Sequence, residues 1–278
     1  MLIATWNVNS IRTRISQVNQ FLEEINPDLL CLQETKVEDN LFPKETLEAN
    51  GYQVHFHGQK AYNGVALISK YPLEDIRLGM NGEHINSKEI DLMNQQKRII
   101  SALIDGIRVV NVYVPNGSSI ESEKYIYKLK WLKHLKHYLE AQQKRDEPLC
   151  LLGDFNIALA EKDIHNPNRF NNGIMASLDE RKALTDVLNG RLEDVFRLFE
   201  QNSGHWSWWD YRSGAWQRDQ GWRIDHIYLC QELIQQTKNC VIHKKTRGNE
   251  KPSDHAPVLA EINWPNQESS FEEEFPVF

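Results

Sequence analysis

Short apolar runs alternate with polar segments along most of the chain. Runs rich in valine, isoleucine and leucine, typical of buried strands, occupy residues 2–8, 28–33, 52–57, 64–69, 97–104, 107–114, 149–154, 223–229 and 257–263. The sequence DGI at 105–107 separates two of these runs and predicts a tight hairpin turn. These runs are the predicted strands of the fold.

Helical periodicity is clearest over residues 121–143, where apolar side chains recur at three- and four-residue steps. Further helices are predicted over 11–25, 178–189 and 191–201. The lysines of the long helix are interpreted as a solvated face; they are Lys128, Lys130, Lys133 and Lys136. Strands and helices alternate irregularly, without repeats or a linker, which predicts one mixed α/β domain over residues 1–265.

Composition and charge narrow the possible partners. No apolar run approaches the length of a membrane span, and four cysteines without C-x-x-C spacing fit a reducing cytoplasm better than a zinc site or disulfides. The formal net charge is −7, and residues 266–278 carry four acids without a lysine or arginine, which predicts a mobile acidic tail. An anionic partner must therefore meet a local basic surface or a metal. We expect a monomer without membrane contact or organic cofactor.

Polar side chains stand where the apolar runs begin or end. The run at 149–154 leads into Asp154 and Asn156, and side chains two residues apart in an extended chain point to the same side. Taken alone, this is best interpreted as an ordinary turn. The other runs place further polar residues in the same way: Asn7, Gln33, Glu34, Tyr113, Asp225, Asp254 and His255. Their joint occurrence favours strands that converge on one polar cleft.

Several carboxylates in one cleft require a counter-charge, and oxygen donors suit Mg²⁺ or Mn²⁺ better than Zn²⁺. Asp154 can activate water, and His255, oriented by Asp225, can hold a phosphate oxygen. Asn156 and Tyr113 can stabilise charge on the phosphorus oxygens. This combination predicts metal-assisted phosphoester hydrolysis. The alternatives are that Glu34 pairs with Lys36 on the surface and that His255 is structural.

Six segments occur in order between residue 1 and about residue 264: WNVNSIR, LCLQETK, NVYVPNG, GDFN, GWRIDHI and PSDHAP. Together they resemble the exonuclease III family of abasic-site (AP) endonucleases, within the endonuclease/exonuclease/phosphatase superfamily. The resemblance implies a DNase I-like four-layer α/β sandwich, two packed mixed sheets flanked by helices. It implies a Mg²⁺-dependent DNA-repair nuclease that cuts 5′ to abasic sites in duplex DNA and has 3′→5′ exonuclease and 3′-end-cleaning activity.

The resemblance also assigns roles to residues. The catalytic positions are Tyr113, Asp154, Asn156, Asp225 and His255. The metal positions are Glu34, as principal ligand, with Asn7, Asp154, Asn156, Asp254 and His255; Mn²⁺ is expected to substitute for Mg²⁺. Asn9 stands where some relatives carry a carboxylate, so the number of metals stays open.

The segment WSWWDYRSGAWQRDQGWRIDH at 206–226 is expected to carry substrate specificity. By resemblance, Trp208, Trp222 and Ile224 line a pocket for an extrahelical baseless sugar, and Arg212 and Asn116 contact the substrate. A missing base makes flipping cheap, and a tight apolar pocket excludes a normal nucleotide. Trp206 and Trp209 are interpreted as core residues. Trp216 either belongs to the core or, with Arg212 and Arg218, contacts the DNA phosphates or the gap left in the helix.

The expected partner is duplex DNA with abasic sites or blocked 3′ ends, and the expected location is the cytoplasm, at the nucleoid if the protein is bacterial. One alternative is a phosphoesterase acting on small molecules, against which the tryptophan-rich segment argues. Another is a non-catalytic binding module, against which the full set of matched catalytic positions argues. The long polar loop at 79–97 either reaches the substrate or is a surface excursion.

Overall fold

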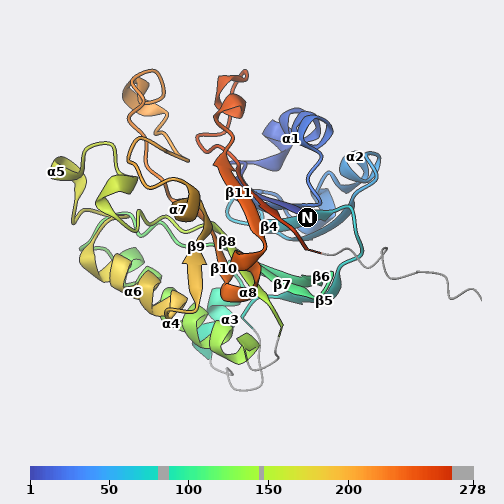
Figure 1. Ribbon diagram of the computed structural model, residues 1–278, viewed down its shortest axis with the longest axis horizontal. Helices are drawn as coiled ribbons and strands as arrows, with labels where there is room; N and C mark the ends of the chain where they lie inside the picture. The colour runs from blue at the N-terminus through green and yellow to red at the C-terminus, as the bar shows by residue number, and fades with distance from the viewer. Residues whose placement is uncertain (81–87, 144–146, 265–278) are drawn as a thin grey trace, which may run out of the picture.

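Two six-stranded mixed sheets pack face to face, with helices on their outer faces (Figure 1). The structure is a computed structural model that describes residues 1–80, 88–143 and 147–264. Its layers are those of the predicted four-layer α/β sandwich, so the fold prediction is confirmed. The predicted acidic tail at 266–278 lies outside the described residues.

The first sheet has the strand order β11-β12-β1-β2-β4-β3. Its strands are β1 (Leu2–Asn7), β2 (Leu29–Gln33), β3 (Gln53–His57), β4 (Val65–Ser69), β11 (Thr237–Ile242) and β12 (Val258–Ile262). β1 runs parallel to β2 and antiparallel to β12. The C-terminal ends of β1 and β2 therefore lie at the same edge as the N-terminal end of β12.

The second sheet has the order β5-β6-β7-β8-β10-β9. Its strands are β5 (Glu74–Leu78), β6 (Ile99–Ile104), β7 (Ile107–Tyr113), β8 (Leu149–Asp154), β9 (Leu192–Asp194) and β10 (Asp225–Cys230). β7 is parallel to β8, and β10 is antiparallel to it. Asp105 and Gly106 both have positive φ between β6 and β7, which confirms the predicted tight hairpin.

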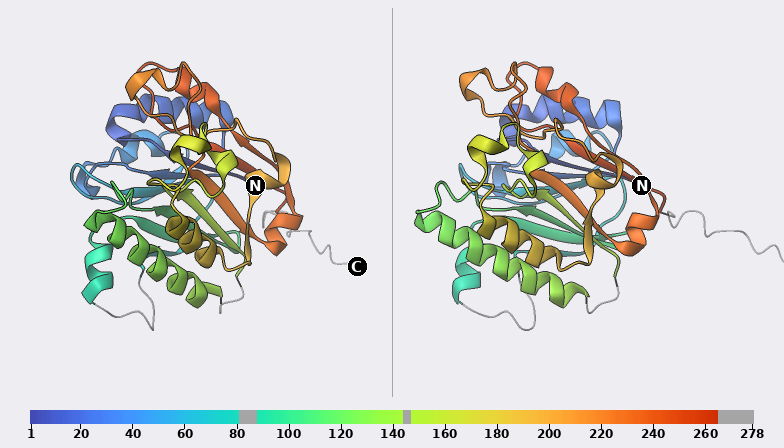
Figure 2. Two further views of the ribbon diagram at one scale, coloured as in Figure 1. Left: turned by 90° about the vertical axis from the view of Figure 1, so that its left-hand side faces the viewer. Right: turned by 60° about the vertical axis from the view of Figure 1, so that its left-hand side comes forward.

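Helices cover both outer faces, as the rotated views in Figure 2 show. The helices are α1 (Ile11–Ile25), α2 (Lys44–Glu48), α3 (Lys88–Asn94), α4 (Glu123–Gln143), α5 (Pro167–Phe170), α6 (Leu178–Leu188), α7 (Val195–Phe199) and α8 (Gln231–Gln235). α1 packs on the first sheet through Val18, Phe21 and Leu22, and α4 packs on the second through Leu132 and Leu135. No helix in the described part of the chain combines the length and apolar character that crossing a membrane requires.

The sequence pattern failed mainly at the sheet edges. β5 and β11 were not predicted, because each lies at or near the edge of its sheet and exposes many of its side chains, so neither reads as an apolar run. The helix predicted over 191–201 is wrong in its first half: residues 192–194 pair with β10 as β9, and α7 follows. The loop predicted at 79–97 contains α3, whose Glu89 contacts Lys130 and His134 on α4.

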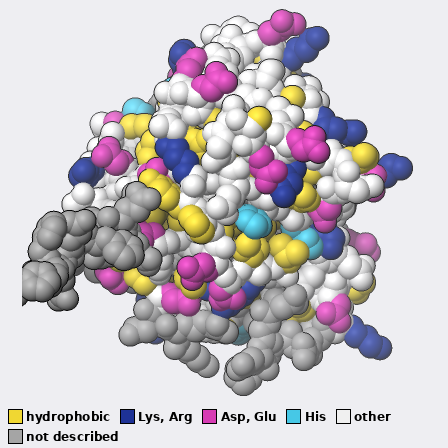
Figure 3. Space-filling view, turned by 90° about the vertical axis from the view of Figure 1, so that its right-hand side faces the viewer, with side chains coloured by type: hydrophobic (Ala, Val, Ile, Leu, Met, Phe, Trp, Pro, Cys, Tyr) yellow, Lys and Arg dark blue, Asp and Glu magenta, His cyan; other side chains and the backbone are white. Residues whose placement is uncertain are grey.

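The face of α4 predicted to be solvated is only partly so. Lys130 and Lys133 are exposed and Lys136 is half-buried, but the side chain of Lys128 is fully buried. The prediction for Lys128 is wrong because α6 packs alongside α4 and brings the carboxylate of Glu180 to it. On the face of the molecule in Figure 3, acidic and basic side chains are interspersed, as the modest overall charge leads one to expect.

Candidate active site

The polar strand ends meet at one edge of the sandwich. Tyr113, Asp154 and Asp225 are register neighbours across β7, β8 and β10. Asn7, at the end of β1 in the other sheet, donates from Nδ2 to Glu34 Oε2 at 2.9 Å and to Asp154 Oδ2 at 2.8 Å. One amide therefore joins carboxylates from both sheets, and the strand ends form the single polar cleft that the sequence predicts.

Asp154 lies at the centre of this cleft and is almost completely buried. Its Oδ1 accepts a hydrogen bond from the backbone N–H of Asn156 at 2.9 Å. Burial, reinforced by the charge of Asp225, raises the pKa of Asp154 to about 7, although the His255 cation and the Asn7 amide favour the ionised form. A carboxyl group with such a pKa is well suited to exchange a proton near neutral pH.

Asp225 and His255 form a tightly held pair. His255 Nδ1 lies 2.8 Å from Asp225 Oδ2, and that oxygen also accepts a 2.6 Å hydrogen bond from Ser207 Oγ. Ser207 Oγ in turn accepts the backbone N–H groups of Ile224 and Asp225 at 3.0 Å. Ser207 thus fixes the carboxylate that orients the imidazole. Nothing in the motif WSWW indicates this role, so it could not be predicted from the sequence.

The imidazole of His255 carries a positive charge. Burial alone would lower the pKa of His255, but the carboxylates of Asp225 and Asp154 outweigh it and raise that pKa to about 10. His255 Nε2 is 3.8 Å from Asp154 Oδ2, so its free N–H faces the cleft. The cation balances two buried carboxylates that water cannot reach.

A second acidic group lies beside this pair. Glu34 Oε1 is 2.8 Å from the ammonium of Lys36, so the predicted alternative of a Glu34–Lys36 pair occurs, but at the mouth of the cleft rather than on open surface. Asn9 accepts a hydrogen bond from Lys36 and donates to Asp254 Oδ1 at 3.0 Å. The other oxygen of Asp254 accepts the indole N–H of Trp208 at 3.0 Å.

Tyr113 contributes a phenol to the cleft. Removal from water and the neighbouring carboxylates of Glu34 and Asp154 raise the pKa of Tyr113 well above its usual range. The guanidinium of Arg98 lies over the ring, 4.8 Å from its centroid, and donates to the Tyr113 carbonyl at 3.1 Å. The phenol is therefore held in place and remains protonated, as a hydrogen-bond donor.

Asn156 is held by contacts on all sides. Its Nδ2 donates to the Val114 carbonyl at 3.0 Å and lies 3.4 Å from Asp154 Oδ2. Its Oδ1 accepts from Asn116 Nδ2 at 2.9 Å. The backbone of Asn156 has a φ of 50°, which places it in the left-handed region. The same-side geometry predicted for Asp154 and Asn156 is thus present, but it arises from a sharp turn after β8 rather than from a continuing strand.

Gly153 makes that turn possible. Its φ is 140°, and a β-carbon at this position would lie 2.0 Å from the Val112 carbonyl oxygen. We expect Gly153→Ala to lower the free energy of unfolding by about 3 kcal/mol or more, measured by urea titration. The matched control is Gly106→Ala, where φ is also positive but nothing lies within 4 Å of the added carbon. Equal losses in both variants would contradict the proposed clash with β7.

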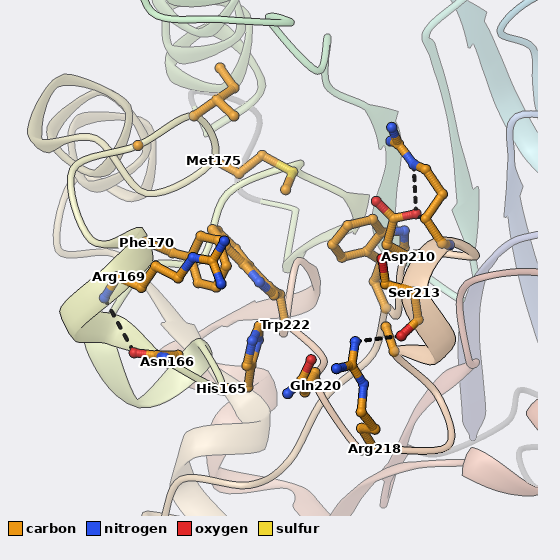
Figure 4. Close-up of a pocket in the computed structure, with 15 residues that line it drawn as sticks. His165, Asn166, Arg169, Phe170, Met175, Asp210, Ser213, Arg218, Gln220 and Trp222 are labelled. Atoms are coloured by element: carbon orange, nitrogen blue, oxygen red, sulfur yellow. Dashed lines mark hydrogen bonds and ion pairs between the residues drawn. The ribbon is translucent and has the colours of Figure 1, made fainter.

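Trp208, which contacts His255, also lines a cavity of about 530 Å³; Figure 4 shows the residues around this cavity. Trp208 and Trp222 lie in it and exchange two backbone hydrogen bonds of 2.9 Å. Phe170, with its ring centroid 5.7 Å from that of Trp222, and Met175 complete an apolar lining. Three arginines also contribute to the cavity; they are Arg169, Arg212 and Arg218. The pocket meets the cleft at His255, whose ring centroid lies 6.5 Å from that of Trp208.

The structure distributes the predicted substrate residues over different positions. Trp208, Trp222 and Arg212 line the cavity, whereas Ile224 is fully buried in the cluster behind Trp222 and supports the wall. Asn116 lies between the cavity and the catalytic cleft, with Nδ2 3.5 Å from Met175 Sδ. As predicted for core residues, Trp206 and Trp209 are buried; Trp216 is half-buried against Trp209.

Gln33 is the one strand-end residue that points away from the cleft. Its Nε2 donates to Thr5 Oγ1 at 2.8 Å and to Asn111 Oδ1 at 2.7 Å, and Asn111 lies in the opposite sheet. The amides of Gln33 and Asn111 thus form a buried polar bridge between the two sheets. Gln33 belongs to the core of the sandwich rather than to the site.

The oxygen donors at the cleft suit a hard divalent cation. Among the described residues, Asp154, Asp225 and His255 bring one possible ligand atom each within 4.8 Å of one another. Asp225 and His255 already pair with each other, with His255 Nδ1 2.8 Å from Asp225 Oδ2. Two more carboxylates accept amide N–H groups in the cleft: Glu34 from Asn7, which also donates to Asp154, and Asp254 from Asn9. Asn7 Oδ1 accepts the N–H of Asn9, whereas its Nδ2 faces the carboxylates of Glu34 and Asp154.

Comparisons with known proteins assign the chain to a family. Residues 4–255 match the model of the Endonuclease/Exonuclease/phosphatase family. The chain is 37% identical over 274 residues to exodeoxyribonuclease III of Haemophilus influenzae. The alignment covers 94% of this chain and all of that protein.

Two solved structures resemble this one over 95% of the chain. The 3′ phosphatase NExo from Neisseria, bound to a product DNA hairpin, superimposes with a TM-score of 0.89 and 37% identity, and is covered completely. An AP endonuclease from Archaeoglobus fulgidus gives a TM-score of 0.88 and 40% identity, with 99% of it covered. The chain belongs to the endonuclease/exonuclease/phosphatase family, in the branch of exodeoxyribonuclease III and the AP endonucleases.

Proposed function

We propose that this protein is a Mg²⁺-dependent nuclease that cuts duplex DNA on the 5′ side of abasic sites and clears blocked 3′ ends. As a member of the exonuclease III branch, it is a DNA-repair nuclease. The observation that carries the proposal is the link between the pocket and the cleft: the ring centroid of Trp208, which lines the pocket, lies 6.5 Å from that of His255, and His255 Nε2 lies 3.8 Å from Asp154 Oδ2. We further propose that it acts as a monomer in a reducing cytoplasm, consistent with four free cysteines.

Asp154 is the proposed base. It takes a proton from the attacking water as the bond from water to phosphorus forms. The bond from phosphorus to the 3′ oxygen breaks, and that oxygen takes up a proton from solvent and leaves as the 3′ hydroxyl. Its pKa of about 7 matches this task, because a stronger acid would hold the proton too weakly.

His255 and Tyr113 stabilise the charge that develops on the phosphate. The imidazolium presents Nε2–H to the cleft while Asp225 and Ser207 fix the other side of the ring. Tyr113 adds a neutral phenol donor. These groups are held by buried hydrogen bonds before substrate arrives, which is the condition for effective stabilisation of a transition state. Because His255 is already charged, we assign it to the phosphate rather than to the metal.

Glu34 is the proposed principal metal ligand, with Asp254, Asn7 and Asn156 as further oxygen donors. The residues fit a hard cation, since Glu34 already attracts the ammonium of Lys36 and the surrounding donors are oxygens. When bound, the cation would hold a phosphate oxygen and offset its negative charge. Mn²⁺ is expected to substitute for Mg²⁺.

The cavity gives the enzyme its proposed preference for abasic sites. A sugar without a base is flipped out of the duplex at little cost, and its apolar face packs against Trp222 and Trp208. The arginines at the cavity, among them Arg212, are proposed to contact the flanking phosphates. The volume of about 530 Å³ exceeds what a bare sugar requires, so DNA backbone is also expected to enter.

We expect Trp222→Ala to reduce cleavage at an abasic site about tenfold or more while changing removal of a 3′ phosphate much less. Loss of the indole removes roughly 1–3 kcal/mol of contact with the flipped sugar, whereas a terminal phosphate reaches the cleft without flipping. Rates on two labelled duplexes, one with an internal abasic analogue and one with a 3′ phosphate, check this. The exposed Tyr62→Ala variant is the control for general damage. Equal losses of rate on both substrates would show that Trp222 does not contribute to the preference for abasic sites.

Inositol phosphates test the competing assignment to a small-molecule phosphoesterase. The proposal predicts phosphate release from DNA ends and no release from inositol phosphates under the same conditions. Turnover of inositol phosphates without cleavage of the abasic duplex would overturn the proposed function.

A further inference from the structure

A lysine and a glutamate lie fully buried behind the catalytic cleft. Lys128 belongs to α4 and Glu180 to α6, and Lys128 Nζ is 2.6 Å from Glu180 Oε1 with neither side chain exposed. Taking two charges out of water costs several kcal/mol, and an apolar pair of similar size is often at least as stable. A contribution to folding stability therefore does not by itself explain why a charged pair is buried here.

The ammonium of Lys128 contacts the cleft directly. It donates to the backbone carbonyl of Asn156 at 2.7 Å and lies 3.3 Å from the carbonyl of Asn116. With Glu180, these contacts use all three N–H donors of the lysine. Asn116 and Asn156 also bond to each other through their side chains at 2.9 Å. Lys128 thus ties together the backbones of two residues whose side chains meet in the site.

Asn156 needs such support. Its backbone lies in the left-handed region, which is unfavourable for a residue with a side chain unless its surroundings hold it there. Its N–H bonds Asp154 Oδ1, so its position also fixes the carboxylate of the proposed base. A shift of the Asn156 carbonyl away from Lys128 would therefore turn both catalytic side chains.

Glu180 carries the connection to the substrate pocket. Its Oε1 accepts the N–H of Met175 at 3.1 Å, and its Oε2 accepts both the N–H and the hydroxyl of Ser177, at 3.1 and 2.7 Å. Met175 lines the cavity and itself has a left-handed backbone. Glu180 therefore holds the pocket wall by the same oxygen that meets Lys128.

We propose that Lys128 and Glu180 are positioning residues that hold the turn carrying Asn156 against the pocket wall at Met175. They thereby keep Asp154 and Asn156 in a constant position relative to the pocket. The proposal rests on the proposed function, since it concerns the same site. Neither residue touches the reacting atoms. Their removal should lower kcat more than it changes KM, because binding surfaces remain while the alignment of the reacting groups is lost.

The test compares Lys128→Met with Arg108→Met. Arg108 is equally buried and ion-paired, with Glu147 and Asp75, but lies at the start of β7, whose other end carries Tyr113. Both variants should lower Tm. At a temperature where both are folded, we expect kcat on the abasic duplex to fall about ten- to a hundredfold in Lys128→Met, with KM within about threefold, and to stay near normal in Arg108→Met. Equal kcat losses, or an unchanged kcat in folded Lys128→Met, would overturn the proposal.

Two further measurements keep the outcome decisive. If Lys128→Met does not fold, the neutral pair Lys128→Met with Glu180→Gln replaces it, with the same expected loss of kcat. Side-chain amide resonances of Asn156 and Asn116 give a reading that does not depend on activity: they should shift and exchange faster in the Lys128 variants but not in Arg108→Met. If the wild-type protein does not cut the abasic duplex, the proposed function fails, and these resonances alone decide the positioning role.

Discussion

Replacing Asp154 by asparagine is expected to lower kcat for cleavage at an abasic site by about 10²–10⁴-fold, the usual contribution of a positioned general base. The substitution keeps the size and the hydrogen bond from the Asn156 N–H but removes the carboxylate that accepts the proton. It also removes a negative charge from a cleft that must receive a phosphate. Binding of the abasic duplex should therefore be unchanged or tighter.

Cleavage of a labelled abasic duplex and fluorescence anisotropy with the same DNA measure the two effects separately. The matched control is Asp179→Asn, an exposed aspartate at the start of α6, which should leave both unchanged. Near-normal turnover in Asp154→Asn would refute the role of Asp154 as base. A parallel collapse of binding would instead mean that the residue mainly shapes the site.

Replacing Glu34 by glutamine is expected to raise the Mg²⁺ concentration needed for half-maximal activity by about tenfold or more, because affinity for hard cations depends on the number of charged oxygen ligands. The amide keeps the shape of the side chain, including an oxygen for the Asn7 amide, but no longer neutralises a cation. High Mg²⁺ should restore part of the lost rate.

Binding of Mn²⁺ followed by electron paramagnetic resonance gives a reading independent of turnover, with weaker binding expected in Glu34→Gln. Glu48→Gln, an exposed glutamate paired with Lys44 on α2, is the control and should bind Mn²⁺ as the wild type does. A Mg²⁺ titration and Mn²⁺ affinity that do not change in Glu34→Gln would remove Glu34 from the metal site.

The central strands and their polar ends could be predicted from the sequence because both signals are local. A strand buried on both faces is an apolar run, and the residue that ends it is visible as a break in that run. Asp154, Tyr113 and Asp225 were found in this way, and the structure places them side by side. A break in an apolar run does not show, however, where the side chain at the break points. Gln33 ends the run of β2 in the same way, but its side chain points between the two sheets.

Residues that support the site could not be predicted from these local patterns. Lys128 occupies a helical position that looks solvated until α6 is placed beside α4, and Ser207 acquires its role only when the tryptophan-rich segment reaches Asp225. Lys128 and Glu180 are 52 residues apart in the sequence, and Ser207 and Asp225 are 18 residues apart. Local hydrophobic periodicity does not predict contacts over such separations. The edge strands β5 and β11 escaped prediction because their exposed side chains remove the apolar signal.

If this cleft cuts DNA 5′ to an abasic site with the help of a divalent metal, the products of the wild-type protein will show it. They are mapped on a duplex with one defined abasic site, with Mg²⁺ and with EDTA. We expect one cut immediately 5′ to the site, leaving a 3′ hydroxyl, that EDTA abolishes and excess Mg²⁺ restores. No cut at the site, or a cut that persists in EDTA, would contradict this expectation.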